Sequence, residues 1–151
     1  MPKKKKDITY YEAIGRRKES TTRVRLYIVS KKDKTVTVGK KQIKQGTILI
    51  NEKLSEEYFP SEAEKQVLLQ PLILTNSVDR FAISIIVRGG GKSGQLDAVV
   101  HGISRALCIV DEDNRALLKK EGLLTRDPRV RERRKVGKGG KARRKKQSPK
   151  R

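Results

Sequence analysis

The stretch that decides the fold is FAISIIVRGGGKSGQLDAVVHGISRALCIV, residues 81–110. Phe81, Ile83, Ile85 and Val87 alternate with Ala82, Ser84, Ile86 and Arg88, which predicts a strand near the centre of a sheet. The glycine-rich residues 89–94 end this strand and open a helix. One stripe of that helix is apolar and predicts its buried face: Leu96, Val99, Val100, Ile103, Leu107 and Val110. A narrow second stripe would permit a close approach to a sheet or to RNA: Ala98, Gly102 and Ala106.

Two further strands are predicted on the N-terminal side of this unit. Residues 8–14 are rich in β-branched and aromatic side chains and form the first strand, which Gly15 closes, so that residues 16–18 lie at a turn. Residues 21–29 alternate cleanly, with Val24, Leu26 and Ile28 facing one way and Arg23, Arg25 and Tyr27 the other. The second face is either an ordinary solvated strand face or, joined to the basic turn, a patch for an anionic partner.

The segment that follows these strands is polar and rich in lysine. Residues 31–46 contain a short strand signal at 35–38 and predict a hairpin or an extended loop on the surface. Residues 47–50 predict another short strand.

Two more helices are predicted. Ser61 and Glu64 have the spacing of a capping box, so a helix begins near Ser61 and is broken or kinked near Pro71. Residues 113–120 predict a last short helix, which Gly122 ends.

These elements predict one mixed α/β domain of two layers, residues 8–125, between two basic ends. The leader, residues 1–7, is expected to be disordered. The tail, residues 126–151, holds fourteen Lys and Arg against two acidic residues, which is +12 of the formal net charge of +21. The tail has too little apolar surface to offset the entropy of ordering, so it is expected to be disordered on its own.

The charge of the tail indicates a polyanionic partner, and nucleic acid fits best. A tail that served only solubility would need far fewer charges. Charges this dense also repel one another, which disfavours that interpretation. A membrane-surface tail would need Phe, Leu or Trp between the charges, and this tail has none, so no membrane partner is expected. A DNA-compacting protein is the nearest rival, but the sequence has no helix-turn-helix, zinc or heptad signal.

Little in the sequence indicates catalysis, a metal or a cofactor. The only histidine, His101, and the only cysteine, Cys108, are too few to hold a metal, and a single cysteine excludes an internal disulfide. The phosphate-binding loop pattern fails because its first glycine would fall at Ile86. A nucleotide hydrolase is therefore a poor alternative. The free backbone N–H groups of the glycine turn and the charge of Lys92 still suit a docked phosphate, although the turn is equally a structural device.

Three motifs, in this order, resemble the universal small-subunit ribosomal protein nine family in its bacterial or organellar form. They are Gly15–Lys18 with Arg23 and Val24; Gly89–Gln95 with Ala98, Gly102, Ile103, Arg105, Ala106 and Leu107; and Gly122–Asp127 with Arg129, Glu132, Arg133 and Lys135. Glu57–Phe59 is also similar to the family. The resemblance implies a mixed four-stranded sheet backed by helices, with a left-handed βαβ crossover that general rules would not suggest.

The resemblance also implies a structural, non-enzymatic role in translation on the cytoplasmic ribosome, or on that of an organelle. The protein would bind small-subunit rRNA in the head of the subunit beside neighbouring head proteins, and its tail would reach the peptidyl-site tRNA. With the charge pattern, this predicts rRNA contacts by Arg16, Arg17, Lys18, Arg23, Arg25, Lys92, Arg126, Arg129, Arg131, Arg133, Arg134, Lys135, Lys138, Lys141, Arg143 and Arg144, and tRNA contacts by Lys150 and Arg151.

The chain departs from the family pattern in two places. The family usually has an aromatic residue after the glutamine near its end, whereas this chain reads Gln147-Ser148-Pro149-Lys150-Arg151 and so lacks that stacking platform. The lysine-rich segment at 30–45 is also longer than the usual short turn of the family and is expected to form an extra surface hairpin.

Overall fold

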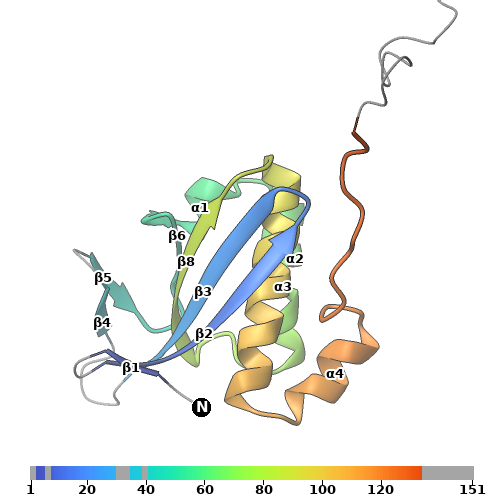
Figure 1. Cartoon of the computed structure of the whole chain (residues 1–151). Coiled ribbons are helices and arrows are strands. Elements are labelled where there is room, and N and C mark those ends of the chain that lie inside the picture. Colours follow the sequence, from blue (N-terminus) through green and yellow to red (C-terminus); the bar gives the residue numbers. More distant parts are fainter. Residues whose placement is uncertain (1–2, 6–7, 30–34, 39–40, 134–151) are drawn as a thin grey trace, which may run out of the picture.

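The structure, a computed structural model, describes residues 3–5, 8–29, 35–38 and 41–133. A twisted sheet packs with one face against helices, and the chain after the last helix runs back along the side of the domain (Figure 1). The elements are β1 (Lys3–Lys5), β2 (Ile8–Arg17), β3 (Ser20–Ile28), β4 (Thr35–Val38), β5 (Lys41–Lys44), β6 (Ile48–Ile50), β7 (Lys53–Leu54), α1 (Ser55–Tyr58), α2 (Glu62–Leu74), β8 (Phe81–Arg88), α3 (Lys92–Val110) and α4 (Asn114–Lys120). The expected mixed α/β architecture is confirmed.

The main sheet has more strands than the four that the family resemblance implied. Its order is β1-β2-β3-β8-β6-β7, so four inner strands are flanked by two short edge strands. Strands β6 and β8 are parallel, and all the other neighbours are antiparallel. The chain passes through α1 and α2 between the two parallel strands. The left-handed sense of this crossover stays a prediction.

Part of the basic leader belongs to the sheet. Residues Lys3–Lys5 form β1 and pair with Ile8–Tyr10 of β2, where the sequence analysis expected a leader without structure. Edge pairing uses backbone groups, so a lysine-rich segment can join a sheet without contributing to a core.

The first strand is longer than predicted. Strand β2 continues through Gly15 to Arg17, which pairs with Ser20, so only Lys18 and Glu19 form the turn. Lys18 has a positive φ of 49°, as a two-residue hairpin turn requires. The prediction that Gly15 ends the strand and that Arg16 and Arg17 lie in the turn is wrong. Arg16 and Arg17 therefore point to opposite faces of the sheet.

The small-residue stripe of α3 lies against the sheet, and RNA has no access to it. A Cβ atom built on Gly15 would lie 1.9 Å from the carbonyl oxygen of Ala98, and one built on Gly102 would lie 2.7 Å from Cγ2 of Val24. The buried Thr22 hydroxyl lies 2.9 Å from the same Ala98 oxygen and hydrogen-bonds to it. Strand β2 and helix α3 can thus approach closely because each has a glycine at the contact, Gly15 in β2 and Gly102 in α3.

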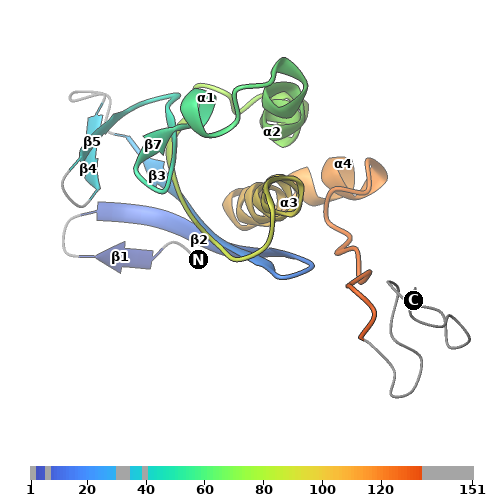
Figure 2. The same cartoon turned by 90° about the horizontal axis from the view of Figure 1, so that it is seen from above.

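The predicted apolar stripe of α3 fills the main core. Leu96, Val99, Val100, Ile103 and Leu107 are buried in one cluster with apolar residues of the main sheet, and Val110 packs at its margin. Helix α2 packs on α3, so the helices form one layer (Figure 2).

The lysine-rich hairpin is confirmed, and it covers part of the other face of the sheet. Ile43 of β5 is buried in a second cluster with Tyr10, Tyr27 and Ala82. Tyr27 shares the outward side of β3 with Arg23 and Arg25, as predicted, but it is buried there, so at Tyr27 this face is neither solvated nor open to an anionic partner. Its ring lies under the hairpin, with its centroid 5.6 Å from that of Tyr10.

Helix α2 begins after Ser61 as predicted, but it is not broken at Pro71. It continues to Leu74, and Pro71 is buried within it. The ring forfeits one backbone hydrogen bond, while the Thr75 hydroxyl donates to the Pro71 carbonyl oxygen at 3.0 Å. Ser61 makes no side-chain cap bond, so the capping box is not formed.

Candidate nucleic-acid interface

Exposed arginines line the face of the sheet that the hairpin leaves open. Arg23 faces outward between Ile14 of β2 and Ile86 of β8, its partners in register. One row nearer the turn, Arg16 and Arg88 lie on either side of Thr21. All three arginines are exposed, and the two isoleucines are about 40% exposed between them. This open face, defined by Arg16, Arg23, Arg88, Ile14 and Ile86, offers charge around an apolar floor.

Sequence reasoning missed Arg88 as a member of this face. The signal was present, because Arg88 occupies the outward-facing register of the strand that was predicted at 81–88. A strand position shows its neighbours only once the pairing of β3 with β8 is known.

Arg25 belongs to the same side of the sheet but is already partnered. Its Nε lies 2.7 Å from Oε2 of Glu12, and its guanidinium carbon lies 4.8 Å from the centroid of the Tyr10 ring. Burial would lower the pKa of Arg25, but hydrogen bonds to Glu12 and Tyr27 outweigh it and leave the pKa raised. Arg25 lines a groove of about 490 Å³ between the hairpin and the sheet. Its guanidinium is held there by Glu12 and Tyr10 and is not a free cation.

The glycine turn is a structural device, with Lys92 exposed at its end. Gly89 and Gly90 have φ of +72° and +66°, which disfavours any other residue. A Cβ on Gly90 would lie 2.0 Å from Oγ of Ser20, so the turn packs on the β2–β3 hairpin. Lys92 is exposed as the first residue of α3.

Gln95 connects the glycine-rich motif Gly89–Gln95 to the motif Glu57–Phe59. Its side-chain nitrogen donates to the Gly89 carbonyl oxygen at 3.0 Å, and its side-chain oxygen accepts from the Tyr58 hydroxyl at 2.8 Å. These two hydrogen bonds link the glycine turn to α1 and so help to fix the position of Lys92 at the start of α3.

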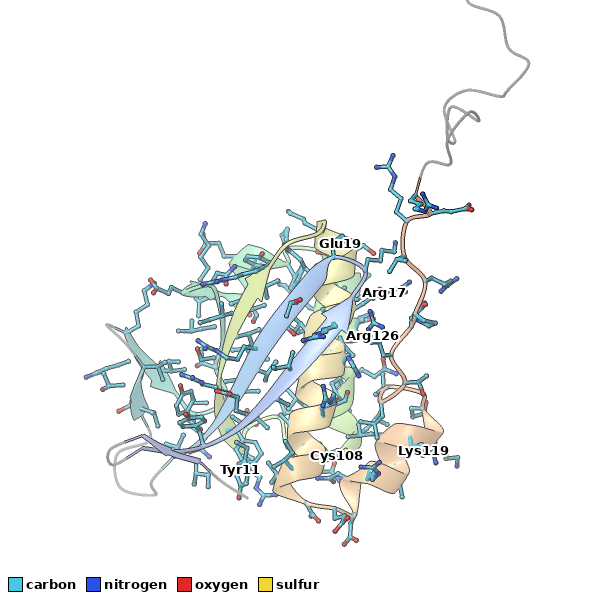
Figure 3. All side chains as sticks on the ribbon, in the orientation of Figure 1. Tyr11, Arg17, Glu19, Cys108, Lys119 and Arg126 are labelled. Carbon is cyan, nitrogen blue, oxygen red and sulfur yellow. The ribbon has the colours of Figure 1, made fainter. Side chains whose placement is uncertain are left out.

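Arg17 points toward the helices, and its side chain is only 12% exposed. Its Nε lies 3.3 Å from Oδ2 of Asp97 on α3, and its Nη1 lies 2.7 Å from Oδ1 of Asp127 at the start of the tail. Figure 3 shows Arg17 and Arg126 on the side where the chain after α4 passes the β2–β3 hairpin. Of the three basic residues 16–18, only Arg16 and Lys18 are exposed.

The first residues of the tail lie along the domain. Asp127 also accepts from the side chain of Arg129, at 2.6 Å to Nη2, and from its backbone N–H at 2.9 Å. These bonds from Arg129, with a further one from Arg17, hold the pKa of Asp127 well below its ordinary value. Arg126, Arg129, Arg131 and Arg133 are exposed. The other predicted tail contacts, Arg134, Lys135, Lys138, Lys141, Arg143, Arg144, Lys150 and Arg151, lie outside the described residues, as does the expected disorder of that part.

His101 is half-buried and has a packing role. Its Nδ1 accepts from the backbone N–H of Arg16 at 3.4 Å, while burial and then the charge of Arg105 lower the pKa of His101. Within the described ranges, no three His, Cys, Asp or Glu side chains gather in a metal-binding group. In the same residues no helix combines the length and apolarity of a membrane span.

Comparison with known proteins agrees with the three motifs. A family model described as ribosomal protein S9/S16 matches residues 15–151. The small ribosomal subunit protein uS9 of Solidesulfovibrio magneticus is 44% identical over 131 residues, which is 87% of this chain and 89% of that protein. The protein of the same name from Rickettsia rickettsii, strain Sheila Smith, is 46% identical over 151 residues, 99% of this chain and 85% of that protein. The resemblance stated from the sequence is confirmed. The chain belongs to the ribosomal protein S9 family, whose members are structural, non-enzymatic components of the ribosome in translation.

Proposed function

We propose that the protein binds small-subunit rRNA in the head of the subunit, beside neighbouring head proteins, through one end of its domain and through its tail. The observation that carries the proposal is the basic end, a group of exposed cations contributed by four separate segments: Arg16, Lys18, Arg88, Lys92 and Arg126. Packing of the glycine turn on the β2–β3 hairpin brings the first four together, and Arg17 holds the start of the tail beside them. The bacterial relatives favour a place on cytoplasmic ribosomes.

The tail extends this surface. Fully extended, the 22 residues from Val130 to Arg151 would span on the order of 70 Å, several times the radius of so small a domain. The tail starts at the basic end, so its cations continue the same positive surface along the phosphates of rRNA. Its tip, Lys150 and Arg151, then contacts the peptidyl-site tRNA.

Deletion of Lys150 and Arg151 should weaken tRNA binding at the peptidyl site without preventing subunit assembly. Together the two charge-assisted contacts contribute roughly 1–2 kcal/mol, so we expect a loss of roughly tenfold. The measurement is filter binding of tRNA to purified small subunits that carry the full-length or the shortened protein. Equal affinities would leave the tail as an rRNA anchor alone.

Replacement of Lys92 by alanine should weaken RNA binding with little loss of stability. Lys92 is exposed at the surface of the domain. Its removal therefore costs one phosphate contact, a few-fold in affinity and roughly 0.7–0.9 in the log–log salt slope. The matched control is Lys119→Ala, an exposed lysine on α4, at the end of the domain away from the basic end (Figure 3). Equal losses from the two variants would mean that the basic end is no preferred RNA contact.

A further inference from the structure

The Arg17 side chain joins three parts of the chain that are distant in sequence. Strand β2 supplies the guanidinium, α3 supplies Asp97, and the start of the tail supplies the carboxylate of Asp127. The same Nη1 also lies 3.4 Å from the carbonyl oxygens of Asp127 and Arg129. A planar guanidinium can bridge such a set of acceptors, whereas an ammonium group acts as a single point charge.

These contacts are hard to reconcile with a direct phosphate contact by Arg17. The Arg17 side chain is only 12% exposed, so little of it is accessible to RNA. The side chain of its partner Asp97 is 50% exposed. The register of Arg17 on β2 turns it toward α3 and away from the open face. A phosphate reaching Arg17 would have to displace Asp127, which is already ionised and hydrogen-bonded.

The segment between α4 and Asp127 is also fixed on its other side. Leu123 and Leu124 pack against the main core, and the N–H of Leu123 donates to the Leu118 carbonyl oxygen at 3.1 Å. The chain is thus held at Leu123–Leu124 by apolar contact and at Asp127–Arg129 by Arg17. Two attachments this close together fix the direction of the chain as well as its position.

We propose that Arg17 is a positioning residue, which clasps Asp97 and Asp127 so that the tail leaves the domain beside the basic end. This inference rests on the proposed RNA-binding function. The contact with Arg17 also explains why an acidic residue, Asp127, occurs in a segment that is otherwise strongly basic. An acid here repels phosphate, but it ties the tail to the place where phosphate is bound.

The first test uses the free protein. Arg17→Gln should loosen the start of the tail, so that the backbone order parameters of Asp127 and Arg129 fall from about 0.8 to below about 0.6. Arg16→Gln is the matched control. Arg16 is adjacent to Arg17 in sequence, but it is exposed and points to the other face of the sheet, so this change should leave the order parameters unchanged. Order parameters that stay high in Arg17→Gln would overturn the clasp, whatever the outcome of any RNA experiment.

The second test depends on the sign of an effect. If Asp127 acts only through its charge, Asp127→Asn removes a repulsion and should tighten binding to an rRNA fragment. The clasp requires the reverse, a loss of roughly threefold to fivefold, with the midpoint of thermal unfolding within about 2 °C of the wild type. Tighter binding by Asp127→Asn would overturn the proposal.

The pair of residues should also act as one unit. Arg17→Gln should weaken binding by a similar factor without lowering the salt slope, and the double variant should bind no more weakly than Arg17→Gln alone. Losses that multiply, or a slope lower by about 0.7–0.9, would make Arg17 a phosphate contact instead. If the unaltered protein fails to bind the rRNA fragment, the proposed function fails, and the order parameters still decide on the clasp.

Discussion

A protein truncated after Arg129 is expected to bind RNA at least a hundredfold more weakly at about 0.15 M salt and with a much flatter salt dependence. The truncation removes twelve Lys and Arg together with one acidic residue. If half of these cations engage phosphates of single-stranded RNA, each contributing about 0.7, the slope of log K against log salt falls by roughly 4. The measurement is a titration of an rRNA fragment at several salt concentrations.

The cut after Arg129 separates the tail from the domain that carries it. The contacts of Arg17 with Asp127 and Arg129 are kept, and Val130 is 57% exposed, so the described part of the deleted segment makes no core contact. We therefore expect the truncated protein to unfold at the temperature of the full chain. A second control replaces the basic residues from 131 onward by glutamine at unchanged length. An unchanged slope in both variants would mean that the tail does not contact RNA.

The elements dominated by local pattern could be predicted from the sequence. Strand β8, the glycine turn and helix α3 lie where the alternation, the glycines and the apolar stripe indicated. These features depend on the period of the chain itself, which is 2 in a strand and 3.6 in a helix. The hairpin β4–β5 was also expected, because its strand signal at 35–38 is local.

The errors arose where a distant segment decides the conformation. Gly15 was interpreted as the end of a strand, since glycine is a poor strand residue. It lies within β2, paired with Thr22, and it is glycine because no Cβ atom fits beside Ala98 and Gly102 of α3, which are more than 80 residues away in sequence. The burial of Tyr27 likewise depends on the hairpin that covers it.

The greater length of β2 altered the candidate site. With Arg16 and Arg17 in a turn, both were expected to contact rRNA; within a strand, one faces the open side and the other faces α3. The charge of the tail was evident from composition, but composition could not show that Asp127 ties its first residues to the domain. Charge identifies a class of partner, and only the pairing of strands assigns each cation to a surface.

Gly15→Ala should be the most destabilising single methyl addition in the domain. The new Cβ atom would lie 1.9 Å from the Ala98 carbonyl oxygen and 2.6 Å from the Gly102 backbone nitrogen, both in a rigid helix. Since neither is a flexible side-chain end, β2 must move away from α3, at a cost of about 3 kcal/mol or more. For a domain of this size the unfolding midpoint should fall by more than roughly 10 °C.

Two other Gly→Ala variants separate lack of space from backbone strain. Gly91 has a negative φ and no atom within 4 Å of an added Cβ, so Gly91→Ala should change the free energy of unfolding by less than about 1 kcal/mol. Gly122 also has open space but a φ of +72°, so Gly122→Ala should cost about 1–2 kcal/mol. Thermal or urea unfolding of the three variants gives the order. If Gly15→Ala were no worse than Gly122→Ala, the close contact of β2 with α3 would not exist in solution. The positions of Arg16 and Arg17 on opposite faces, and with them the clasp, would then lose their structural basis.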